Sequence, residues 1–243
     1  MNDSEPNARE PALNIPLPLT LLIAALLAIH LALVLAPISV RFTAIERLAF
    51  IPARLGAIDG GAEQLWMWLT YAFLHGDWPH VIANTLWLAV FGSPVLKRIG
   101  LARFAALSVS GAVGSVALHL VFYWGSPQPL IGFSGVVSAL TGAAARFMFP
   151  RSGLNPIAPE ASPRLSVLET FQNRGSLAFI IVWFVANLLF GSGVLTPEGA
   201  RIAWEAHIGG FVVGLFAFGL LDPQPARSLP TNESDEPSDP SSR

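Results

Sequence analysis

The chain contains six apolar stretches, and these restrict it to the folds that a lipid bilayer allows. A membrane-spanning helix needs about 20 apolar residues, and residues 17–36 form a nearly uninterrupted run of that length. Only 12% of the residues are charged, whereas soluble domains carry about 25%. We therefore expect an all-α, polytopic integral membrane protein with six transmembrane helices. The expected spans are 17–36, 80–96, 101–123, 134–149, 176–190 and 202–221.

Polar segments flank this membrane domain, which we place at residues 17–221. Residues 1–16 and 222–243 are rich in proline and polar residues, a composition typical of disordered tails. A cleaved signal peptide is the competing interpretation of the first stretch. We disfavour it because the apolar run exceeds the usual length of about 7–15 residues, and because the tail before it mixes acidic residues with a single arginine.

Residues 37–79 are less apolar and include an aromatic cluster between Trp66 and Phe73. Trp and Tyr side chains favour the headgroup region of a bilayer. We expect this segment to be a long structured loop that lies partly in the membrane interface.

The distribution of lysine and arginine predicts the orientation of the spans. Six spans place both termini on one side of the membrane, and that side carries most of the basic residues. The positive-inside rule therefore predicts that both termini are cytoplasmic. The expected cytoplasmic residues are Arg9, Lys97, Arg98, Arg103, Arg151, Arg164, Arg174, Arg227 and Arg243, against Arg41, Arg47, Arg54 and Arg201 outside.

The fourth stretch begins at Ser134, directly after a loop rich in proline and glycine. A helix from Ser134 to Phe149 is about 24 Å long, which is shorter than a hydrocarbon core of about 30 Å. The serine is therefore expected below the outer face of the membrane. The loop before it must enter the membrane, which is tolerated where protein or a water-filled cavity surrounds the backbone.

Polar residues in three of the spans are expected at a similar depth near the outer face. They are Ser134, His207 at the start of the sixth stretch, and His80 with Asn84 on the second. His80 and Asn84 are four residues apart, so they lie on one face of a helix. Ionisable groups inside membrane spans are candidates for function because their burial is costly.

This set of residues predicts acyl-transfer chemistry. A serine needs a neighbouring base to act as a nucleophile, and histidine is the usual partner. The His80 ring, the Asn84 amide and the Ser134 backbone N–H could stabilise an oxyanion. Glu205 is expected on a different helix face from His207, so we predict a Ser134–His207 dyad rather than a triad.

Structural interpretations of the same residues remain open. A serine in a membrane helix often serves only helix packing, and a histidine or asparagine can bond a neighbouring backbone. Small residues recur along two stretches and predict close contact between them, which would also bring His207 to Ser134. They are Ser134, Ser138, Thr141, Gly142 and Ala145 on the fourth stretch, and Gly210 and Gly214 on the sixth.

Three motifs together resemble those of the rhomboid intramembrane serine proteases: GFSG at 132–135, HVIAN at 80–84 and AHIGGFVVG at 206–214. The resemblance covers residues 17–221 and implies a six-helix rhomboid-like bundle. It implies that Ser134 is the nucleophile, that His207 is the base, and that His80 and Asn84 help to form the oxyanion hole. It also implies cleavage of single-span membrane proteins near the outer face, without a metal or cofactor.

Two positions depart from the family pattern. Trp66-Met67 stands where the family has a Trp-Arg pair, and Ser138 stands where some members carry an aromatic residue beneath the histidine. The latter leaves the orientation of His207 less determined. His75 resembles a structural loop histidine of the family. The remaining histidines, His30 and His119, are expected to be interhelical hydrogen-bonding or interfacial residues.

Two other classes of function compete with a protease. The first is a catalytically silent rhomboid-like protein that binds membrane clients, although such proteins usually lack the serine or the histidine. The second is a small transporter, which the clustering of polar groups at one depth disfavours. The net charge of −2 gives no argument for nucleic-acid binding, and the absence of cysteine excludes thiolate chemistry. We expect the lipid bilayer, most simply a bacterial inner membrane, as the environment.

Overall fold

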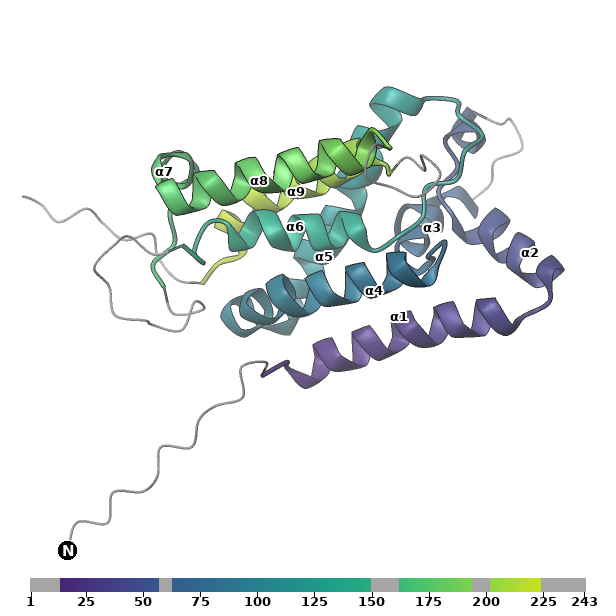
Figure 1. Cartoon of the computed structure of the whole chain (residues 1–243), viewed down its shortest axis with the longest axis horizontal. Helices are drawn as coiled ribbons and strands as arrows, with labels where there is room; N and C mark the ends of the chain where they lie inside the picture. The colour runs from purple at the N-terminus through teal and green to yellow at the C-terminus, as the bar shows by residue number, and fades with distance from the viewer. Residues whose placement is uncertain (1–13, 57–62, 150–161, 194–201, 224–243) are drawn as a thin grey trace, which may run out of the picture.

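A computed structural model describes residues 14–56, 63–149, 162–193 and 202–223, and the regular elements within these ranges are all helices (Figure 1). Most of the expected tails 1–16 and 222–243 lies outside the described residues, namely 1–13 and 224–243, as do 57–62, 150–161 and 194–201 with Arg151 and Arg201. The α-helices are α1 (Leu17–Leu35), α2 (Ile38–Leu48), α3 (Glu63–Thr70), α4 (Trp78–Trp87), α5 (Ser93–Tyr123), α6 (Ser134–Ala144), α7 (Val167–Gln172), α8 (Arg174–Gly191) and α9 (Trp204–Leu221).

The all-α fold class is confirmed, and several helices suit a bilayer. In the described part of the chain, four helical segments are long and apolar enough to span: α1, α8, α9 and the 46-residue segment Trp78–Tyr123. The last contains α4, a π-helical turn Leu88–Gly92 and α5. Gly100 interrupts it with φ 76°, a conformation that glycine adopts without steric cost. This break separates the expected second and third spans, while the count of six remains a prediction.

Helix α6 lies at the centre of the bundle, where every residue from Gly135 to Ala144 is buried. It packs mainly against α5 and α9, and Figure 1 shows it between α4 and the α8–α9 pair. A Cβ added to Gly214 would collide with the backbone of Ala139, and one added to Gly210 would collide with the Gly135 carbonyl. The expected close contact between the small-residue stripes is therefore confirmed.

The expected end of this helix at Phe149 is wrong, because α6 ends at Ala144. Beyond it the chain tightens into turns in which Arg146 N–H donates to Ala143 and Phe147 N–H donates to Ala144, both at 3.1 Å. These turns leave Arg146 buried, and its guanidinium donates to the Leu165 and Leu215 carbonyls. The helix is thus 11 residues long, or about 16 Å.

The segment 37–79 is also more regular than expected. It contains α2 and α3, together with the 3₁₀ helices Pro52–Gly56 and Tyr71–Phe73. Two side chains of α3 bond the end of α2, since Trp66 Nε1 donates to the Arg47 carbonyl at 3.0 Å and Thr70 Oγ1 to that of Leu48 at 2.7 Å. The expected loop is therefore a small helical subdomain.

Asp222, the first residue of the expected C-terminal tail, contacts the helical bundle. This carboxylate accepts hydrogen bonds from Arg98 at 3.1 and 2.9 Å, and both side chains are fully buried. Arg98 also donates to the Ser162 carbonyl at 2.6 Å. A buried arginine needs such a counter-charge, so Asp222 belongs to the packed bundle.

Candidate active site

The loop that leads to Ser134 is held by backbone hydrogen bonds to the segment 49–75. Leu130 and Phe50 exchange two N–H···O=C bonds of 2.8 and 3.1 Å. Gly132 N–H donates to the Tyr71 carbonyl at 3.0 Å, and Phe133 N–H donates to His75 Nε2 at 3.4 Å. The helical subdomain therefore fixes the position of the serine, which is the first residue of α6.

Helix α9 brings His207 to this serine. The histidine lies in the first turn of α9, and its Nε2 is 2.8 Å from Ser134 Oγ. The contact depends on the close approach of α6 and α9 at Gly210, where the Gly135 carbonyl leaves no room for a Cβ. The two residues that the sequence nominated as a dyad are thus within hydrogen-bond distance.

The other ring nitrogen of His207 has a partner that the sequence analysis missed. His207 Nδ1 is 2.6 Å from Oδ1 of Asn187, a residue of α8. The Asn187 amide nitrogen in turn donates to the Trp183 carbonyl at 2.7 Å. Asn187 carries the one side-chain amide of an otherwise apolar stretch, Leu177–Phe190, and a polar group in a membrane helix calls for a partner. This lone amide in an apolar stretch is the feature of the sequence from which Asn187 could have been identified.

Glu205 does not contact His207, in agreement with its expected helix face. Its Oε1 lies 2.7 Å from His119 Nδ1, and both side chains are buried. His119 also stacks on Tyr123, with ring centroids 4.8 Å apart. The hydrogen-bonding role expected for His119 is therefore confirmed, and the acidic residue nearest in sequence to His207 is engaged elsewhere.

His80 lies beside the serine, across the backbone of Gly132. A Cβ built on Gly132 would be 2.7 Å from His80 Nε2 and 3.6 Å from Ser134 Oγ, so one point lies close to both groups. Gly132 has φ 121°, which only glycine adopts readily. This glycine thus provides the space between the His80 ring and the serine hydroxyl.

Asn84 is buried one turn further along α4. One of its amide N–H groups donates to the His80 carbonyl at 3.0 Å. An asparagine amide has two donors, so this bond leaves one N–H of Asn84 for another acceptor.

His75 and His30 are the two histidines that lie near His80. The pKa of His75 is lowered to about 4, chiefly by burial and then by the neighbouring His80 and His30. The rings of His75 and His80 make an edge contact with centroids 5.0 Å apart. His30 packs edge-on against Trp78 at 4.7 Å, and neither of its ring nitrogens has a hydrogen-bond partner among the described residues. The hydrogen-bonding role expected for His30 is therefore not observed.

The two departures from the family pattern both occupy buried positions. Met67 packs in the hydrophobic core rather than presenting a charge, and Ser138 is buried one turn after Ser134. Ser138 thus offers His207 no aromatic ring for support, and the side chain that contacts its Nδ1 is that of Asn187.

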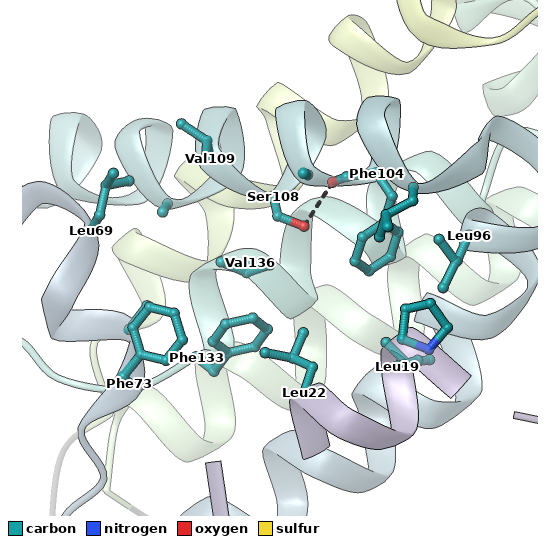
Figure 2. Close-up of a pocket in the computed structure, with 15 residues that line it drawn as sticks. Leu19, Leu22, Leu69, Phe73, Leu96, Phe104, Ser108, Val109, Phe133 and Val136 are labelled. Atoms are coloured by element: carbon teal, nitrogen blue, oxygen red, sulfur yellow. Dashed lines mark hydrogen bonds between the residues drawn. The ribbon is translucent and has the colours of Figure 1, made fainter. Parts of the chain in front are cut away.

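A separate apolar cavity of about 400 Å³ opens between α1, α5 and α6 (Figure 2). Phe133 and Val136 line it from the serine-bearing segment, together with Leu22 of α1 and Phe104 of α5. Its one polar side chain, Ser108, donates to the Phe104 carbonyl of its own helix at 2.8 Å. Neither Ser134 nor His207 lines this cavity.

Elsewhere, no three His, Asp or Glu side chains of the described residues gather as metal ligands.

Comparison with known proteins relates this geometry to a family. The family described as "Rhomboid domain" matches residues 62–223. Rhomboid protease GlpG of Serratia proteamaculans is 32% identical over 152 residues, covering 63% of this chain and 46% of that protein. Rhomboid protease GlpG of Yersinia pestis is 30% identical over the same coverage. The chain therefore spans about half the length of these relatives. The family match covers more than half of this chain, which shows that the chain is a member of the rhomboid family.

Proposed function

We propose that this protein is an intramembrane serine endopeptidase that cleaves transmembrane segments of other proteins near the outer face of the membrane. The observation that carries the proposal is the 2.8 Å contact between Ser134 Oγ and His207 Nε2 in a rhomboid chain. Relatives named as proteases support the same assignment.

In the proposed reaction His207 Nε2 accepts the Ser134 hydroxyl proton as Oγ attacks the carbonyl carbon of the scissile peptide bond. The tetrahedral intermediate collapses, and the imidazolium returns the proton to the leaving amine. A water molecule then attacks the acyl-enzyme while His207 again accepts a proton. The products are two peptides, and the free serine is restored.

The proposed oxyanion hole combines the start of α6 with two side chains of α4. The first backbone N–H groups of a helix have no partner within it, which leaves the Ser134 N–H as a donor. The His80 ring lies next to the serine across Gly132, and Asn84 retains one amide N–H. Removing a single donor of this kind typically costs about 10²–10³ in rate.

The substrates that we propose are membrane proteins with a single span, cut at small residues where the helix is easily unwound. A peptide bond in a stable helix is shielded by its own hydrogen bonds, so local unwinding must precede attack. We also propose that both termini of this protein are cytoplasmic and that it resides in a bacterial inner membrane.

Cleavage of a single-span test substrate in proteoliposomes tests the proposal. Ser134→Ala and His207→Ala should each lower kcat/KM by at least about 10³-fold, since nucleophile and base act as a unit. Both should melt at temperatures close to the wild-type value. Ser138→Ala is the matched control, because it removes a buried hydroxyl from the same helix, and it should cleave normally.

Near wild-type cleavage by either dyad variant would contradict the proposal. So would a wild-type protein that binds the substrate and leaves it intact, which is the behaviour of a silent client-binding protein.

A further inference from the structure

We infer that Asn187 is a positioning residue that fixes the ring orientation and the tautomer of His207. Its consequence for rate rests on the proposed protease function, whereas its effect on the tautomer does not. The inference follows from the chain of contacts Trp183–Asn187–His207–Ser134, in which each donor and acceptor can be assigned in turn.

The first step is the orientation of the Asn187 amide. The Trp183 carbonyl oxygen can only accept a hydrogen bond, so the amide atom 2.7 Å from it must be the nitrogen. The atom 2.6 Å from His207 Nδ1 is therefore the amide oxygen, Oδ1. An amide oxygen can only accept, which requires a hydrogen on His207 Nδ1.

The second step is the state of the imidazole. A neutral histidine carries one N–H, so a hydrogen on Nδ1 leaves Nε2 with a free lone pair. That lone pair lies 2.8 Å from Ser134 Oγ and can accept its proton. The alternative tautomer would direct an N–H at the serine and could not act as a base.

The third step concerns how much more strongly Asn187 binds His207 once the imidazole becomes charged. The Nδ1–H···Oδ1 bond is then charge-assisted and stronger than in the neutral state. A neutral amide suits this place because a carboxylate in the membrane is costly. The charged and titratable groups nearby are His80 beside the serine and Glu205, whose Oε1 is held by His119.

The fourth step concerns the helix that carries Asn187. Along α8 the buried side chains are few, and they include Ser176 and Ile180. Near the active site the helix is held against α9 at Gly191, where an added Cβ would lie 2.7 Å from Trp204. The alignment of His207 therefore depends on the distance between α8 and the start of α9.

Two substitutions of nearly equal shape separate hydrogen bonding from packing. Asn187→Leu removes the acceptor and should lower kcat by about 10- to 100-fold, the range found for partners that orient a metal-bound histidine. Its KM should stay within about twofold, because Asn187 bonds the histidine and not the substrate. Asn187→Asp keeps an acceptor for the Nδ1–H, so its kcat should be closer to that of the wild type than the kcat of Asn187→Leu is, although the buried carboxylate should lower its melting temperature. Leu188→Ala, on the exposed face of the same helix, should have no effect.

The tautomer is read directly by ¹⁵N NMR of histidine-labelled protein in detergent micelles, with His207→Gln used for assignment. Wild-type His207 should be protonated on Nδ1, and Asn187→Leu should shift it toward the Nε2–H form. An Nε2–H tautomer in the wild type, or equal kcat in Asn187→Leu and wild type, would overturn the inference. If the wild type cleaves nothing, the proposed function fails, and the NMR result still decides the role of Asn187.

Discussion

His75 illustrates how a single residue ties the loop before α6 to the rest of the molecule. Its Nε2 accepts the Phe133 N–H at 3.4 Å, one residue before the serine. Only a neutral imidazole nitrogen can accept this bond, and burial keeps the ring neutral by lowering its pKa to about 4. Protonation of His75 would therefore break this bond between the loop and the segment before it.

This coupling predicts that stability depends on pH. The pKa of His75 is about 4 in the folded protein against 6.5 for a free side chain. Between these values the unfolded state binds more protons, so the free energy of unfolding falls as the pH drops through this window. Melting temperatures measured from pH 7 to pH 4 should fall more steeply for the wild type than for His75→Gln. Equal slopes would show that His75 titrates normally.

At the scale of single residues, the sequence predicts which polar side chains belong to the site more reliably than it predicts which of them are in contact. The motifs nominate Ser134, His207, His80 and Asn84, because each lies at a fixed distance from a recognisable neighbour in the chain. Asn187 follows no such spacing. It lies 20 residues before His207 on a separate helix, and only the packing of α8 against α9 brings the two side chains together.

At the scale of helices, the site exists because α6 and α9 approach closely. Glycines on both helices allow this: the Phe211 carbonyl of α9 occupies the space beside Gly142, and the Ala139 backbone occupies that beside Gly214. Backbone contact of this kind is a general means of helix association in membranes. It also sets the separation of Ser134 from His207 near the N-terminal ends of the two helices.

Gly214→Ala tests this dependence. The new methyl group meets backbone atoms of Ala139 that cannot move aside, so the helices should separate. We expect a loss of about 1–3 kcal/mol of stability, as in other overpacked interiors, together with slower cleavage. Gly76→Ala is the control, because its nearest neighbour is a side-chain atom of Ile131 at 3.9 Å. If both variants melt and cleave alike, the close approach is not what holds the site.

The sequence predicts which stretches are helical more reliably than where they end. Apolar periodicity continues to Phe149, yet α6 ends at Ala144, because Arg146 bonds carbonyls of two other segments. Those partners are distant in sequence and cannot be read from the helix itself. Likewise, the mixed composition of 37–79 hides α2 and α3, which a hydrogen bond from Trp66 to the Arg47 carbonyl joins. The bonds to the active-site loop come from Phe50 and Tyr71, which lie just after these two helices.

On the scale of the whole molecule, polar interactions occupy the two ends of the bundle. Ser134 begins α6 and His207 lies in the first turn of α9, whereas Arg146 and Asp222 follow the ends of the same helices. At this second end Arg98 and Asp222 form a fully buried ion pair. The guanidinium of Arg98 also lies 4.7 Å from the Phe147 ring centre. The pair joins the start of α5 to the end of α9, which sequence alone does not indicate.

Breaking this ion pair should destabilise the bundle without touching the catalytic residues. Asp222→Ala leaves Arg98 buried without its carboxylate partner, which typically costs about 3–5 kcal/mol. Glu46→Ala is the matched control: it breaks the exposed pair with Arg54 and should cost under about 1 kcal/mol. Thermal unfolding in detergent distinguishes the two, and similar losses would contradict the importance of the buried pair.

The central claim is that His207 activates Ser134 as a nucleophile, and covalent labelling with a fluorophosphonate tests it most directly. After reaction of the purified protein in a detergent that preserves cleavage, peptide mass mapping should locate a single adduct on Ser134. The adduct should be lost in His207→Ala. Absence of labelling in a preparation that cleaves substrate, or an adduct on a different serine, would contradict the account.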